Sequence, residues 1–208
     1  MPNSKNYQSI WKNLEARYTE DTLYVGNYQV MQTWEKPIMM ALARVVTENG
    51  GDILEVGFGL GISATYIQEF GAKSHTILEP HPVVFKRAQE WKKKYKSDSI
   101  ILINDFWQNQ VDKLPKFDGI LYDIYTSDVV VEEEKVLFQF FEVAKDLLKD
   151  EGILTFFCFR KGFLNEEYQK RLLQHFSSIT ISMVNGLKPP KDCQYWSDST
   201  MIIPKVVK

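Results

Sequence analysis

The spacing of apolar and polar residues is typical of helices in the first part of this chain and of alternating strands and helices in the rest. Apolar positions return every three or four residues across residues 7–19 and again across residues 33–46, where Pro37 falls in a first turn. The pattern therefore predicts two amphipathic helices before the first strand. Gly26-Asn27 interrupts the first helical pattern, and Asn49-Gly50-Gly51 ends the second.

From residue 52 onward, short apolar runs alternate with longer helical stretches. The expected strands are residues 53–56, 75–78, 100–103, 117–122 and 153–159. The expected helices are residues 62–70, 80–95, 132–148 and 166–176. This alternation predicts an α/β fold with a mostly parallel sheet and helices on both faces. Two late β-rich stretches, 179–184 and 194–207, lie on either side of Pro189-Pro190 and predict a C-terminal antiparallel hairpin.

The first expected strand runs into a stretch with three glycines at alternate positions. It reads Asp52-Ile-Leu-Glu-Val-Gly-Phe-Gly-Leu-Gly-Ile62, with glycine at 57, 59 and 61. Glycine lets a backbone adopt positive φ and approach a ligand closely, so a cradle for a small cofactor is expected at this strand-to-helix turn. An ordinary turn is the alternative, although such a turn seldom needs three glycines.

Acidic residues stand at the ends of the first four expected strands. They are Glu55, Glu79, Asp105 and Asp123. In an open parallel sheet, ligands bind beyond the carboxyl ends of the strands, so these side chains are expected along the ligand-binding edge. Any one of them could instead cap a following helix, an explanation that is weaker for all four together.

Length and composition narrow the class of protein. The chain has 208 residues, of which 44% are hydrophobic and 25% charged, as expected for a single globular domain. The net charge of −2 argues against a nucleic-acid footprint. Cys158 and Cys193 have no CxxC spacing, so neither a metal site nor a disulfide framework is expected. Without an apolar signal segment or a run long enough to span a bilayer, we expect a soluble, cytoplasmic protein.

Two cofactor classes compete for the glycine stretch. A dinucleotide site would bind pyrophosphate at the helix start, and Glu79 has the spacing of its ribose-binding acid. However, the third glycine of that fingerprint would fall at Ile62, whereas here it stands one position earlier, giving ExGxGxG. An edge lined by carboxylates would repel pyrophosphate and attract a sulfonium, which favours S-adenosylmethionine.

Several segments carry a family resemblance. Glu55–Gly61 resembles motif I of class I methyltransferases, and four further stretches are similar to the guanidinoacetate N-methyltransferase family: Val30–Met39, Phe117–Asp123, Pro189–Cys193 and Met201–Pro204. The resemblance covers nearly the whole chain from Trp11 onward. It implies a Rossmann-like class I methyltransferase fold, with residues 1–50 as a helical segment or lid over the active site and residues 51–208 as the S-adenosylmethionine-binding domain.

The resemblance also implies a set of site residues. Those implied to bind the cofactor are Trp11, Met31, Met39, Val56, Gly57, Phe58, Gly59, Leu60, Gly61, Glu79, Pro80, His81, Trp107, Gln108 and Asp123. Trp11, Met31 and Met39 could instead be core residues of the N-terminal helices. Glu35 and Asp123 are implied to be the catalytic carboxylates that bind the guanidino group. Glu35 could otherwise be a first-turn carboxylate that complements a helix dipole.

Two carboxylates suit the chemistry of a guanidino acceptor. A guanidinium has no free lone pair until it loses a proton, and it would approach a positively charged sulfonium. Carboxylates at Glu35 and Asp123 would offset that repulsion and orient one nitrogen by bidentate hydrogen bonds. We expect Asp123 to take the proton as the new bond forms, and Glu35 mainly to orient and neutralise.

The acceptor is less well defined than the cofactor. Phe159 and Arg160 align with a short stretch that holds the substrate carboxylate in the family, although Arg160 could also be an exposed loop residue. Guanidinoacetate, arginine or another guanidino acid therefore remain open, as do a small amine and a protein arginine. A cofactor-binding module without catalysis is a further alternative. The partner is expected to be a small guanidino substrate, with no nucleic acid or membrane, and the chain is expected to be a monomer or a homodimer.

Overall fold

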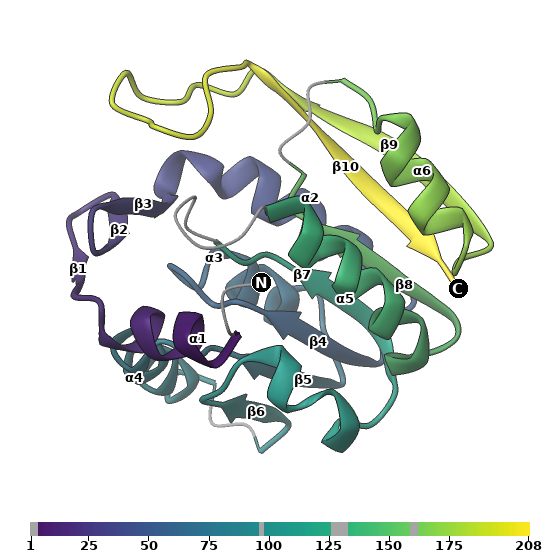
Figure 1. Cartoon of the computed structure of the whole chain (residues 1–208), viewed down its shortest axis with the longest axis horizontal. Coiled ribbons are helices and arrows are strands. Elements are labelled where there is room, and N and C mark those ends of the chain that lie inside the picture. Colours follow the sequence, from purple (N-terminus) through teal and green to yellow (C-terminus); the bar gives the residue numbers. More distant parts are fainter. Residues whose placement is uncertain (1–3, 96–97, 126–132, 159–161) are drawn as a thin grey trace.

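The computed structural model describes residues 4–95, 98–125, 133–158 and 162–208 (Figure 1). Its centre is a seven-stranded sheet with the order β6-β5-β4-β7-β8-β10-β9. These strands are β4 (Asp52–Val56), β5 (Ser74–Leu78), β6 (Ile100–Ile103), β7 (Phe117–Tyr122), β8 (Leu148–Phe156), β9 (Ser178–Asn185) and β10 (Thr200–Val207). The first five are parallel, and β10 is antiparallel to both neighbours. The predicted α/β fold with a C-terminal hairpin is confirmed.

The register of the sheet places three strand ends side by side. Val56 pairs with Leu78 of β5 on one side and with Tyr122 of β7 on the other. The loops that follow these strands therefore leave the sheet at one edge. Because strand order reverses at β4, this edge is the crevice in which an open parallel sheet binds its ligand.

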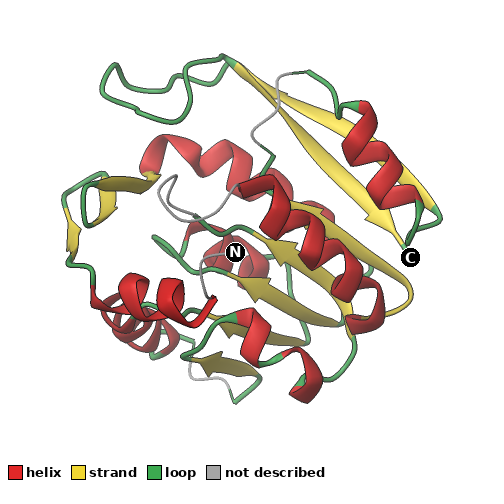
Figure 2. Cartoon of the chain, viewed as in Figure 1, coloured by secondary structure: helices red, strands yellow, loops and turns green. Residues whose placement is uncertain are grey.

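Helices cover both faces of the sheet (Figure 2). They are α1 (Ser4–Asn13), α2 (Lys36–Val46), α3 (Ile62–Glu69), α4 (Pro82–Lys92), α5 (Glu133–Leu147) and α6 (Glu166–Leu173), with short 3-10 turns η1 (Thr33–Glu35), η2 (Trp107–Asn109) and η3 (Val111–Lys113). Ile53 packs with α2 and α3, whereas the next residue, Leu54, packs with α5 on the opposite face. This alternation is the period of two of a strand buried on both sides.

The N-terminal segment differs from its prediction. The expected helix over residues 7–19 is wrong beyond residue 13, because α1 ends at Asn13 and the chain enters a small antiparallel sheet. Its strands are β1 (Ala16–Tyr18), β2 (Thr22–Val25) and β3 (Tyr28–Gln32). Gly26, at φ 58°, forms the β2–β3 turn and is not a break between helices. Residues 1–50 are therefore not purely helical.

Residues 186–199 connect β9 to β10 and extend beyond the sheet towards α2 and β3 (Figure 1). The expected β-rich stretch at 194–207 begins only at Thr200, so its first six positions belong to this connection. We call residues 186–199 the C-terminal loop. In the described ranges, no helix has the length and hydropathy needed to cross a membrane.

Candidate active site

Two glycines after β4 have a positive φ and pack closely against other parts of the protein. Gly57 and Gly59 have φ of 97° and 54°. A Cβ on Gly57 would lie 2.0 Å from the carbonyl oxygen of Asp123, and one on Gly59 would lie 2.6 Å from Sδ of Met31. These glycines thus allow the loop to pack directly against β7's end and β3. We call residues 57–61 the glycine loop.

Glu79, at the end of β5, joins the glycine loop to the next loop. Its carboxylate accepts hydrogen bonds from the backbone N–H of Phe58 at 3.1 Å and of His81 at 2.7 Å. The residue is only 6% exposed, and burial raises the pKa of its carboxyl to about 7 against the opposing effect of these hydrogen bonds. Glu79 therefore presents a buried carboxylate at the edge where the resemblance implies the ribose.

Glu35 lies where η1 meets α2, with 3% of its surface exposed. Its Oε1 accepts two hydrogen bonds, from the backbone N–H of Gln32 at 2.7 Å and from the hydroxyl of Tyr195 at 2.5 Å. Its Oε2 has no hydrogen bond to any residue that the structure describes. Burial first, and the charge of Asp123 second, raise the pKa of Glu35 to about 8.

Asp123 follows β7 and is the second of the two predicted guanidino-binding carboxylates. Its backbone N–H donates to the carbonyl of Val56 at 2.9 Å, which fixes the chain beside the glycine loop. Within the described residues its carboxylate forms neither a hydrogen bond nor a salt bridge. Burial, followed by the nearby charge of Glu55, raises the pKa of Asp123 to about 7. Asp123 and Glu35 are close enough for one charge to perturb the other, as expected of a site that binds a cation.

Two of the other predicted cofactor residues lie along the same edge. The sulfur of Met31 accepts the backbone N–H of Leu60 at 3.2 Å, so β3 is bound to the glycine loop. Trp11 is buried; its ring stacks against Tyr125 at 6.2 Å and lies edge-on to His81 at 6.4 Å. Both residues pack in the N-terminal segment and also contact the loops of the site, and their binding of the cofactor stays a prediction.

Other predicted cofactor residues are spread between the surface and the core. Met39 is completely buried among the residues that α2 packs against the sheet. Trp107 is buried against the edge of Phe140, and its indole N–H has no hydrogen-bond acceptor among the described residues. Gln108 is exposed and Pro80 is half-buried. Val56 and Phe58 are both about fully buried, and each belongs to a core cluster beside the loop.

The acidic strand ends do not share one role. Asp105 accepts hydrogen bonds from the backbone N–H of Phe106 and the amides of Asn109 and Gln110, so it caps its own loop. Glu55 is completely buried beneath the glycine loop, bonded to the hydroxyl of Ser63 and 3.0 Å from Nε2 of His75. Only Glu79 and Asp123 of the four stand beside the loops with carboxylates available to a ligand.

Two predicted acceptor-binding residues lie outside the described residues, and one residue that contacts the site was not predicted. Phe159 and Arg160, expected at the acceptor carboxylate, lie outside the described residues. Tyr195 is hydrogen-bonded to Glu35 but was not among the expected site residues. No periodicity marks it; the only signal near it is that the family-like stretch Pro189–Cys193 ends two residues earlier.

The residues present fit S-adenosylmethionine. This cofactor carries a sulfonium, an ammonium and a ribose diol, all of which pair favourably with carboxylates. Glu79 and Asp123 offer buried or half-buried carboxylates on either side of the glycine loop, and neither forms a salt bridge with a described residue. The switch-point edge, the glycine loop and these acids together define a class I, S-adenosylmethionine-dependent methyltransferase.

Comparison with known proteins makes the assignment more specific. The family model described as guanidinoacetate N-methyltransferase matches residues 1–176. The chain belongs to this family.

Curated proteins similar to this chain include protein arginine N-methyltransferases. Protein arginine N-methyltransferase 2 of Candida glabrata is 32% identical over 158 residues, covering 70% of this chain and 36% of that protein. Its namesake in Kluyveromyces lactis is 30% identical over 163 residues, covering 72% and 38%. The chain thus spans well under half the length of these curated relatives.

A solved structure shows the same fold. N-methyltransferase NodS from Bradyrhizobium japonicum WM9, in complex with S-adenosyl-L-homocysteine, has a TM-score of 0.59 and 16% identity, covering 84% of this chain and 87% of that one.

Proposed function

We propose that this enzyme methylates a nitrogen of a guanidino group held between Glu35 and Asp123, on a small molecule such as guanidinoacetate, arginine or a related guanidino acid. The observation that carries the proposal is the pair itself. Burial raises the pKa of both carboxyls, the charge of Asp123 raises that of Glu35 further, and no described cation forms a salt bridge with either. A bound cation would stabilise the ionised form of such a pair. The family match supports the same acceptor chemistry.

The carboxylates would counter an electrostatic barrier. S-adenosylmethionine, when bound, supplies a methyl group on a positively charged sulfur. A guanidinium about 4 Å from such a charge is repelled by roughly 4 kcal/mol at an effective dielectric of about 20. Glu35 and Asp123 would neutralise the acceptor and hold one of its nitrogens in line with the methyl group.

The two carboxylates would divide the work. Glu35 has one oxygen bonded to Gln32 and Tyr195, which leaves Oε2 to orient the acceptor. Asp123 has no hydrogen bond from a described residue on either oxygen, and its pKa of about 7 is closer to that of an efficient proton acceptor than an ordinary aspartate's. Asp123 would take the guanidinium proton as the carbon–nitrogen bond forms.

The N-terminal segment would close the site. Trp11 of α1 lies on Tyr125, two residues after Asp123, and the carbonyl of Leu14 bonds to Nε2 of His81 at 2.9 Å. These contacts tie α1 and the turn after it to the loops after β5 and β7. We propose that the segment is a lid that keeps water from the reacting groups.

Protein arginine is the second candidate acceptor, and the two Protein arginine N-methyltransferase 2 relatives favour it. The guanidino group would bind to the same carboxylates in either case. What differs is the rest of the acceptor, which is a polypeptide in one case and a small acid in the other.

Release of S-adenosylhomocysteine tests the proposal. The acceptors are guanidinoacetate, free arginine, arginine peptides, and the matched amines glycine and ornithine, each with S-adenosylmethionine. A small guanidino compound should be turned over at least about 100-fold faster than its matched amine, since only the guanidinium matches two planar carboxylates. Activity confined to arginine peptides would select the second candidate. Equal or better turnover of the amines would contradict both.

A further inference from the structure

The C-terminal loop reaches the acceptor side of the site from the far end of the chain. It leaves β9 at the sheet's edge, and its two ends are joined by the backbone hydrogen bond from Leu187 to Ser199 at 2.9 Å. In Figure 1 it extends past α2, away from the strands it connects. The family match covers residues 1–176 and therefore ends before this loop.

One glutamine clamps the loop to the small N-terminal sheet. Gln29 of β3 is only 2% exposed, and its side-chain amide forms two hydrogen bonds with the loop backbone. Its Nε2 donates to the carbonyl of Asp192 at 2.9 Å, and its Oε1 accepts the N–H of Gln194 at 2.8 Å. A buried amide satisfied on both sides fixes the position of the loop just before Tyr195.

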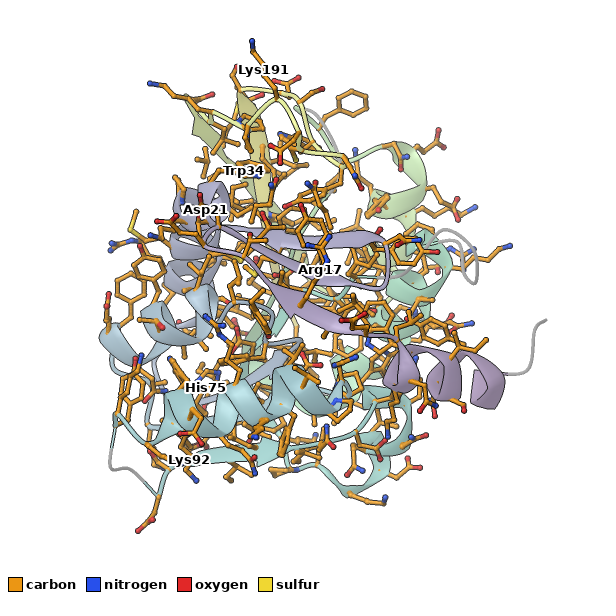
Figure 3. All side chains as sticks on the ribbon, turned by 90° about the vertical axis from the view of Figure 1, so that its left-hand side faces the viewer. Arg17, Asp21, Trp34, His75, Lys92 and Lys191 are labelled. Atoms are coloured by element: carbon orange, nitrogen blue, oxygen red, sulfur yellow. The ribbon has the colours of Figure 1, made fainter. Side chains whose placement is uncertain are left out.

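A stacked tryptophan then fixes the ring of Tyr195. Trp34 lies beneath the loop that carries Lys191 in Figure 3, and its ring stacks on Tyr195 with 6.2 Å between centroids at 28°. The indole N–H of Trp34 donates to Oε1 of Gln32 at 3.0 Å. Gln32 in turn donates its backbone N–H to Glu35. Trp34 and Tyr195 are thus held by the same short stretch that holds the carboxylate.

We propose that Tyr195 is a positioning residue, which keeps Oε1 of Glu35 occupied so that only Oε2 faces the guanidino group. The inference rests on the proposed function, because it assigns the acceptor geometry of that site. Without the hydroxyl, Glu35 would rotate between two equivalent oxygens and would lose its second donor. In the wild type, the C-terminal loop would therefore determine, through Tyr195 and Glu35, which guanidino nitrogen faces the methyl group.

The proposal predicts a change in the pH dependence of kcat/KM. The titratable groups that face Glu35 are Asp123 and Tyr195, and Cys193 is the further group that perturbs Tyr195. A hydroxyl that donates to a carboxylate stabilises its charged form, so removing the hydroxyl raises the pKa of Glu35. Acceptor binding needs ionised Glu35. The acidic limb of the pH profile of kcat/KM therefore moves to higher pH when the hydroxyl is lost.

The test compares Tyr195→Phe with Tyr66→Phe, a matched control whose half-buried ring lies on α3 against Phe70. With the acceptor that the wild type methylates best, Tyr195→Phe should lose about 10-fold to 100-fold in kcat/KM, as for a hydrogen bond to a charged group. Its acidic limb should move up in pH while the Tyr66→Phe profile stays unchanged. Gln29→Ala should shift the limb in the same direction, and adding it to Tyr195→Phe should cause little further loss.

Melting temperature provides a readout that needs no acceptor. The hydrogen bond from Tyr195 is strongest to ionised Glu35, so the Tm difference between wild type and Tyr195→Phe should widen from pH 6 to pH 9. A constant difference, or a Tyr195→Phe profile that matches Tyr66→Phe, would overturn the inference. Wild-type inactivity towards every guanidino compound would instead overturn the proposed function, and the Tm comparison would still decide whether Tyr195 supports ionised Glu35.

Discussion

The two halves of the proposed site are built in different ways: the cofactor half comprises the glycine loop and Glu79, and the acceptor half comprises Glu35, Asp123 and Tyr195. The cofactor half is assembled from consecutive strand ends: Glu79 binds the N–H of Phe58, only 21 positions away, across neighbouring strands. The acceptor half joins distant segments, since Glu35 and Tyr195 are 160 positions apart and Gln29 and Asp192 are 163 apart. One half follows from the sheet, whereas the other requires the N-terminal and C-terminal parts of the chain to meet.

The halves also differ in how their charges are satisfied. Glu79 is bonded to backbone N–H groups of two loops, so its carboxylate has a structural role before any ligand binds. Asp123 has no described partner for its side chain and is free to bind and to accept a proton. Substitutions in the cofactor half should therefore change binding and stability, and those in the acceptor half should change turnover.

The largest effect is expected at Asp123. Asp123→Asn keeps the size of the side chain but removes the proton acceptor, so kcat should fall by about 10²-fold to 10⁴-fold. Affinity for S-adenosylhomocysteine, measured by calorimetry, should change only a few-fold. Near-normal turnover would show that Asp123 is not the base, and a parallel loss of cofactor affinity would erase the distinction between the halves.

The same variant should be more stable than the wild type at high pH. The pKa of Asp123 is raised to about 7 in the folded, ligand-free protein, so folding favours its protonated form. That stability is complete below the unfolded pKa near 4 and is lost as pH rises to about 7. Asparagine never ionises. The Tm of Asp123→Asn relative to wild type should rise between pH 5 and pH 8, and a flat difference would contradict the raised pKa.

A smaller effect is expected from the glycine loop. Gly57→Ala places a Cβ 2.0 Å from the Asp123 carbonyl at a φ of 97°, and strain with overpacking should cost about 2–5 kcal/mol of stability. Gly71→Ala is the control, because its φ is 82° but no atom lies within 4 Å of the added Cβ. It should cost about 1–2 kcal/mol. Equal losses in chemical denaturation would mean that the contact with Asp123 is unimportant.

The smallest effect is expected at Glu79. Glu79→Gln removes the charge and leaves one acceptor oxygen for the two backbone N–H groups of Phe58 and His81, so the KM for S-adenosylmethionine should rise about 10-fold to 100-fold. The KM for the acceptor should stay within a few-fold of wild type. A change confined to the acceptor KM would reverse the assignment of this residue.

The cofactor half could be predicted from the sequence because its signals are local. Glycines at 57, 59 and 61 and the acid at Glu79 follow from strand ends and their spacing. Even so, Asp105 shares the position of Glu79 in the pattern but caps its own loop. Sequence position alone does not distinguish a ligand-binding carboxylate from a cap.

The acceptor half could be predicted only in part. Glu35 and Asp123 came from the family resemblance, whereas Tyr195 and the clamp at Gln29 did not. Both missed residues act through long-range contacts that leave no periodic pattern. The small sheet was missed for a related reason: residues 16–32 form short antiparallel strands whose pairing overrides the helical spacing of Leu14 and Tyr18.

Proton release on acceptor binding tests most directly whether Glu35 and Asp123 hold one guanidinium together. With pKa values raised to about 8 and about 7, both are partly protonated at pH 7 in the free enzyme. A bound guanidinium should force them to ionise, so calorimetry at pH 7 in buffers of different ionisation enthalpy should show release of about one proton per acceptor. The enzyme is saturated with S-adenosylhomocysteine, and the Glu35→Gln/Asp123→Asn variant should release none. Binding of the acceptor without proton release in the wild type would contradict the account.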